Sequence, residues 1–85
     1  MDQQFNGLMV ALRSIVRLDD HKSVEAAKLQ IWRCIQPLVE ADKKPFLERL
    51  RTEAIAEENK APSDLAKLFW RDVAEYALSP TKPKN

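Results

Sequence analysis

The apolar residues of this chain recur at the spacing of an α-helix in four successive stretches. Residues three or four positions apart share one face of a helix, and no stretch shows the strict alternation expected of a half-buried strand. The stretches run from about Gln3 to Leu18, Ser23 to Glu40, Lys44 to Glu58 and Ser63 to Leu78. The pattern predicts an all-α, single-domain bundle of three or four amphipathic helices with short connections.

Polar residues and prolines indicate where these helices begin and end. Asp42 is expected to cap the third helix, with Pro45 in its first turn, and Ser63 is expected to cap the fourth. Pro37 lies inside the second stretch and removes a backbone hydrogen bond there. The second helix should therefore either kink at Pro37, or stop and restart with this proline in a first turn.

The fourth stretch carries apolar residues on a broad face. By their spacing, those expected to face the core are Leu65, Leu68, Phe69, Val73 and Tyr76. Trp70 lies at the edge of this stripe, beside Lys67 and Arg71. A tryptophan near an arginine is typical of interface hot spots, but it can equally cover the edge of a bundle. The sequence leaves both positions of Trp70 open.

The chain has 85 residues, near the lower limit for a self-sufficient core. Residues 1–78 are expected to form the helical domain, and residues 79–85 a disordered, flexible tail rich in proline and lysine. A core of this size supplies only about 3–5 kcal/mol of net stability without disulfides, a metal or oligomerisation. The single Cys34 cannot form an internal disulfide, and one cysteine with one histidine is too few ligands for structural zinc. Self-association, as a homodimer, is the remaining stabiliser.

Some apolar residues do not fit the buried faces of their own helices. Val10, Leu29 and Ile55 fall outside the stripes that their neighbours form. Surplus apolar surface at helical spacing is typical of contact with another subunit or a partner. The predicted partner-binding surface consists of Trp70, Leu29, Val10 and Ile55, with Arg17 and Arg71 as polar anchors.

The overall charge does not favour a protein dedicated to coating DNA. Lys+Arg number 14 and Asp+Glu 13, which gives a formal net charge of +1, whereas such proteins carry a strong basic excess. Basic residues do cluster locally, because Arg13 and Arg17 lie one helical turn apart and Lys43 precedes Lys44. The alternative function is therefore a nucleic-acid-associated accessory protein that uses Arg13, Arg17, Lys43 and Lys44 on a basic helix face.

The residue types that most often carry catalysis are not placed in a reactive pattern. His21, the one histidine, follows two aspartates that could orient a general base, but no nucleophile is placed near it. Cys34 lies on the apolar face of the second helix, where burial raises the pKa of a thiol and makes it unreactive. One glycine excludes a glycine-rich phosphate loop. The sequence predicts no enzyme, no metal site and no cofactor.

The N-terminal residues MDQQFNG lack the basic and long apolar segments of a signal peptide. No apolar run approaches the roughly 20 residues that span a bilayer. We therefore expect a cytoplasmic protein with Cys34 reduced and no membrane partner. Together these patterns favour a small, non-enzymatic protein–protein interaction module that self-associates and regulates or inhibits a larger protein by binding it.

Overall fold

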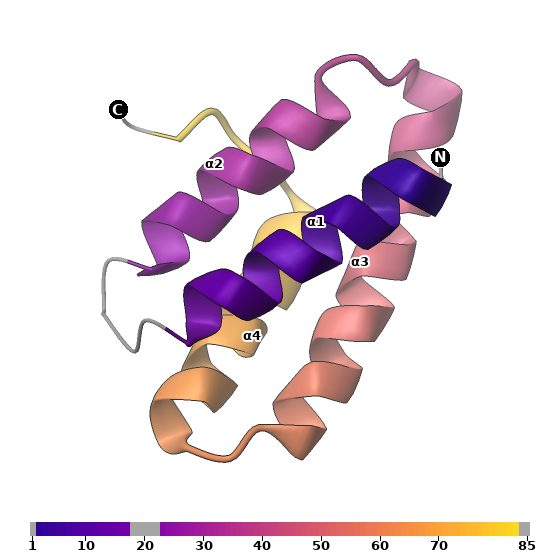
Figure 1. Cartoon of the computed structure of the whole chain (residues 1–85). Helices are drawn as coiled ribbons and strands as arrows, with labels where there is room; N and C mark the ends of the chain where they lie inside the picture. The colour runs from indigo at the N-terminus through magenta and orange to yellow at the C-terminus, as the bar shows by residue number, and fades with distance from the viewer. Residues whose placement is uncertain (1, 18–22, 84–85) are drawn as a thin grey trace.

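The computed structural model describes residues 2–17 and 23–83 of the chain. Its four helices are α1 (Asp2–Val16), α2 (Ser23–Ile35), α3 (Glu40–Lys60) and α4 (Asp64–Leu78) (Figure 1). The prediction of a small all-α bundle is confirmed. None of these helices has the combination of length and hydrophobicity needed to cross a membrane, as far as the described residues go.

The second helix stops before Pro37 instead of kinking at it. α2 ends at Ile35, and the amide of Leu38 donates to the Ile35 carbonyl at 3.1 Å to close the turn that follows. Pro37 lies within this turn and not in a first helical turn, which corrects that part of the prediction. The chain resumes a helix at Glu40, four residues earlier than the apolar spacing suggested.

The caps of the last two helices differ in kind. Val39 precedes α3 without any side-chain cap, and Asp42 lies inside the first turn, where its charge suits the helix dipole. The prediction that Asp42 caps this helix is therefore wrong. Ser63 caps α4 as predicted, because its Oγ accepts a hydrogen bond from the amide of Ala66 at 3.2 Å.

The early start of α3 moves Pro45 from the first turn into the second. The amide of Lys43 already donates to the Val39 carbonyl at 3.0 Å, so Pro45 stands where the helix would otherwise make another such bond. We expect Pro45→Ala to raise the free energy of unfolding by about 2 kcal/mol in urea denaturation, because a proline inside a helix costs about 3 kcal/mol relative to alanine and its stiffening of the unfolded chain offsets up to about 1 kcal/mol. Pro62→Ala, in the connection between α3 and α4, is the control and should give no gain. An unchanged or lowered stability of Pro45→Ala would contradict this account.

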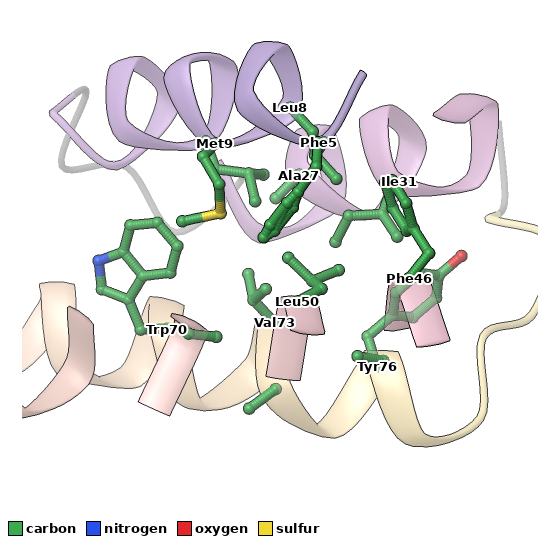
Figure 2. Close-up of a cluster of buried hydrophobic side chains, with 14 of the residues drawn as sticks. Phe5, Leu8, Met9, Ala27, Ile31, Phe46, Leu50, Trp70, Val73 and Tyr76 are labelled. Carbon is green, nitrogen blue, oxygen red and sulfur yellow. The ribbon is translucent and has the colours of Figure 1, made fainter. Parts of the chain in front are cut away.

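The helices pack around one core to which all four contribute. α3 and α4 form the most closely packed pair, while α1 lies against α2 and α2 against α4. Large side chains meet in the centre from every helix (Figure 2), and the most deeply buried of them are Phe5, Leu12, Ile31, Leu50 and Val73. This packing fixes which sides of the helices remain for contact with other molecules.

The buried face of α4 is rotated relative to the predicted one. Leu65 and Leu68, expected in the core, are 51% and 50% exposed, whereas Trp70 and Ala74 are buried. Alanines on the buried face allow close approach of a neighbouring helix, and α3 is the closest neighbour of α4. The rotation leaves two leucines of α4 facing outward.

The C-terminal tail begins directly after α4. Residues 79–83 are not helical, and the Tyr76 hydroxyl donates to the Thr81 carbonyl at 2.6 Å. Thr81 and Pro83 come near Glu25 and Lys28 of α2. The absence of helix from residues 79–83 agrees with the sequence analysis, while disorder of the tail stays a prediction.

Candidate functional site

Trp70 belongs to the core of the domain. Its side chain is 2% exposed and meets the ring of Phe69 edge to face, with centroids 5.1 Å apart. Met9 points toward it from α1 (Figure 2). Of the two positions that the sequence left open, the structure shows the buried one. The prediction that Trp70 forms part of the partner-binding surface is corrected accordingly.

The other predicted contact residues lie on separate helices. Val10 of α1 is 62% exposed, Ile55 of α3 is 38% exposed, and Leu29 of α2 is partly buried. Arg71 holds α4 to α3, because its Nε and Nη2 donate to Glu58 Oε2 at 3.1 and 3.0 Å. Arg17 lines the second of the two cavities described next, and the other four line neither. Their role in binding stays a prediction.

A groove forms where the end of α2, the first half of α3 and the end of α4 meet. Its volume is about 640 Å³. We call it the basic groove; its lining residues are Trp32, Ile35, Gln36, Glu40, Lys43, Lys44, Leu47, Glu48, Arg51, Ala77, Leu78 and Pro80. Trp32 is partly buried and Leu78 is 65% exposed, so the floor offers apolar surface to solvent. A concave, mostly apolar surface with a few placed charges is the usual form of a binding site.

The charges of the basic groove lie along α3. Lys43 Nζ pairs with Glu40 Oε1 at 3.1 Å, which uses one cation locally. Arg51 follows Lys44 by seven residues, so the two lie on the same side of α3, about 10 Å apart along the axis. Among the described residues, neither has a carboxylate within ion-pair distance. Lys44 and Arg51 therefore border an apolar floor together with Glu48, and the groove keeps a net positive charge.

Sequence reasoning missed most of this groove. Lys43 and Lys44 were singled out, but as nucleic-acid contacts, and Trp32 was not among the proposed contact residues. The groove joins Trp32 to Leu78, which lie far apart in the sequence. The one available signal was the helix break at Pro37, because a turn there brings Lys43 and Lys44 of α3 close to the end of α2.

A second cavity, the arginine cleft, lies between α1, α3 and α4 and has a volume of about 420 Å³. Arg13 and Arg17 line it together with Glu57 and Lys60, and Trp70 contributes to the wall. Glu57 Oε1 is shared by Arg13 Nη2 at 3.4 Å and Lys60 Nζ at 3.9 Å. The cations of the cleft are thus partly neutralised.

The four predicted nucleic-acid contacts are divided between these two cavities. Lys43 and Lys44 lie at the basic groove, whereas Arg13 and Arg17 lie at the arginine cleft. Glu57, which Arg13 contacts, is fourteen residues beyond Lys43, or about 21 Å along α3. The structure does not gather these four residues on one helix face.

The outward side of α4 carries leucines and acids together. We call this surface the acidic stripe; its residues are Leu65, Leu68, Asp72 and Glu75, which helical spacing places along one side. Among the described residues, Arg71 bonds Glu58, and Lys28, which shares a small cavity with Asp72 and Glu75, pairs with Glu25 at 3.7 Å. The acidic stripe is therefore apolar and negatively charged.

The groups most often used in catalysis show no reactive arrangement within the described residues. Burial raises the pKa of the Cys34 thiol, as the sequence predicted, and the thiol is therefore protonated at neutral pH. Burial also raises the pKa of the Tyr76 hydroxyl, which stays a donor to Thr81. His21 lies outside the described residues. No cluster of three potential metal ligands is found in residues 2–17 and 23–83.

Comparison with protein-family models, curated proteins and solved structures finds no match to this chain. The function is therefore argued from the surfaces themselves. Of these, the basic groove combines the largest described volume with apolar side chains and with two cations that have no ion-pair partner among the described residues.

Proposed function

We propose that this protein is a small, non-enzymatic interaction module that binds a partner protein through the basic groove. The observation that carries the proposal is the combination of partly accessible Trp32 and Leu78 with Lys44 and Arg51 at the same cavity. Tryptophan and arginine are the residues most enriched in interface hot spots. By covering a surface of a larger protein, such a module would regulate or inhibit it.

The groove suits an amphipathic helix that carries acidic residues. Helices bind grooves by placing apolar side chains one turn apart into a hydrophobic floor, and Trp32, Leu47 and Leu78 supply that floor. Carboxylates on the flank of the same helix would meet Lys44 and Arg51, where charge-assisted hydrogen bonds add affinity and orientation. The cytoplasm is the proposed location, because a lone thiol such as Cys34 suits a reducing compartment.

A direct test uses two synthetic amphipathic helices with identical leucine positions. One carries glutamates beside the leucines and the other carries lysines. We expect the acidic peptide to shift the NMR signals of the Trp32 indole N–H and of the Leu47 and Leu78 methyl groups. The groove variant, Lys44→Glu/Arg51→Glu, should weaken its binding by about tenfold or more, because both attractions become repulsions.

The matched control for this experiment is Arg33→Glu/Lys67→Glu, which changes the net charge equally at two exposed positions outside the groove. It should bind the acidic peptide like the unaltered protein, apart from a small screening effect that added salt removes. Equal binding of both peptides, or signal shifts that map away from Trp32 and Leu78, would refute a binding role for the groove.

The nucleic-acid alternative has less support from the geometry. Sequence-independent binding to a phosphate backbone depends on unneutralised Lys and Arg residues. Arg13 pairs with Glu57 and Lys43 with Glu40, so two of the four proposed contacts already face carboxylates. The remaining two, Arg17 and Lys44, belong to different cavities.

A further inference from the structure

We propose that the acidic stripe of one copy of this chain occupies the basic groove of a second copy. This inference rests on the proposed function, because it assigns a particular partner to the same groove. The stripe has the chemistry that the groove requires, namely leucines near carboxylates on one side of a helix. Binding between the two surfaces would give the small core the additional burial that its length calls for.

The apolar part of the stripe is available for contact. Leu65 and Leu68 are about half exposed although their helix is otherwise well packed, and they lie nearly one turn apart. Leucines three residues apart are the spacing at which a docked helix inserts side chains into a groove. The opposing surface offers Trp32, Leu47 and Leu78. Each patch leaves apolar surface in water that the other can cover.

The charges of the two surfaces are opposite once internal ion pairs are set aside. Within residues 2–17 and 23–83, no cation forms an ion pair with Asp72 or Glu75 of the stripe, because Lys28 and Arg71 are paired with glutamates of α2 and α3. At the groove, Lys43 is paired with Glu40, so Lys44 and Arg51 remain beside the single carboxylate of Glu48 and the groove keeps a net positive charge. Complementary potentials of this kind select the partner and fix its orientation.

Both surfaces include α4, which allows the contact to be made twice. The acidic stripe runs along the outer side of α4, and Leu78 at the end of the same helix lines the groove. A two-fold axis beside α4 can therefore place each stripe on the other copy's groove, giving a closed dimer in place of an open chain. The dimer would contain two identical stripe–groove contacts.

The experiment compares two charge-reversed proteins alone and mixed. The groove variant makes both of its surfaces acidic, and the stripe variant, Asp72→Lys/Glu75→Lys, makes both of its surfaces basic. In sedimentation velocity, each variant alone should dimerise at least about tenfold more weakly than the unaltered chain, because like charges face each other. An equimolar mixture should recover the dimer, since every groove then meets a stripe of opposite charge.

Two further measurements separate this inference from loss of folding and from the proposed function. Circular dichroism of each variant should match the unaltered chain, and Leu68→Asp should abolish the dimer while keeping the helical signal. A monomer at all concentrations of the unaltered chain, or a mixture no more dimeric than its components, would overturn self-association through these surfaces. Binding of the acidic peptide in the groove would still stand in that case, and its absence would instead refute the proposed function.

Discussion

Trp70→Ala is expected to unfold the domain. The indole is 2% exposed, packs edge to face on Phe69 and lies in the same buried cluster as Met9. Replacement of a buried tryptophan by alanine removes about 3–5 kcal/mol of stability. A core of this length supplies a similar amount, about 3–5 kcal/mol. The variant should therefore show little near-ultraviolet circular dichroism and no cooperative urea transition at 25 °C.

Two other substitutions make this result interpretable. Val10→Ala shortens a side chain that is 62% exposed and should leave the free energy of unfolding nearly unchanged. Trp70→Phe retains an aromatic ring and should fold with reduced stability, which tests the packing even if the alanine variant is insoluble. If the Trp70→Ala protein unfolds like the unaltered chain but no longer binds its partner, Trp70 must belong to an interface and not to the core.

The existence of the helices and the inner faces of the first two could be predicted from the sequence. Phe5, Leu8, Met9 and Leu12 lie on one side of α1, and polar residues cover most of the other side. A helix with one apolar side has only one orientation that buries it, so spacing alone decides which residues face inward. The break near Pro37 could also be predicted from the local sequence, because proline disfavours a continuous helix.

The orientation of α4 could not be predicted in the same way. Leu65 and Leu68 on one side compete with Trp70 and Ala74 on another, and periodicity gives both sets similar weight. The choice depends on the neighbouring helix, because α3 lies close to α4 and covers its alanine-rich face. Only the tertiary arrangement decides this, and it reverses the roles of Trp70 and the two leucines.

The candidate site depends on tertiary structure even more strongly. Lys44 is conspicuous in the sequence as part of a basic pair, but its significance changes when Trp32 and Leu78 lie at the same cavity. These residues come from three helices, and no local spacing relates them. Likewise, Arg13 and Lys43 look like parts of one basic set until their separate acidic partners, Glu57 and Glu40, are seen.

Phe5→Ala is expected to have the second large effect, by releasing α1 from α3. The backbone of α1 packs closely on α2 but approaches α3 at few points. Side chains fill the space between them: the ring of Phe5 meets that of Phe46 edge to face, with centroids 5.6 Å apart and planes at 79°. The guanidinium carbon of Arg49 lies 4.1 Å from the Phe5 ring centroid, and its Nη1 pairs with Asp2 Oδ1 at 2.8 Å.

Phe5→Ala should lower the free energy of unfolding by about 3–5 kcal/mol. Because the core supplies a similar amount, about 3–5 kcal/mol, the variant should lose its cooperative urea transition, as Trp70→Ala should. A double-mutant cycle with the milder replacements Phe5→Leu and Phe46→Leu, which should leave a measurable urea transition, should give a coupling energy of about 0.5–1.5 kcal/mol, the usual range for an edge-to-face pair. Arg49→Ala is the contrasting variant and should cost only about 0.5–1 kcal/mol, because its cation–π contact and ion pair are exposed. If Phe5→Ala proves no more destabilising than Arg49→Ala, α1 must be held by its other contacts, namely those with α2, Met9 against Trp70, and the Arg13–Glu57 pair. A large effect of Phe5 would instead show that the Phe5–Phe46 pair is the main contact between α1 and the α3–α4 hairpin. Hydrogen exchange of the α1 amides in Phe5→Leu would reveal whether α1 detaches before the rest unfolds.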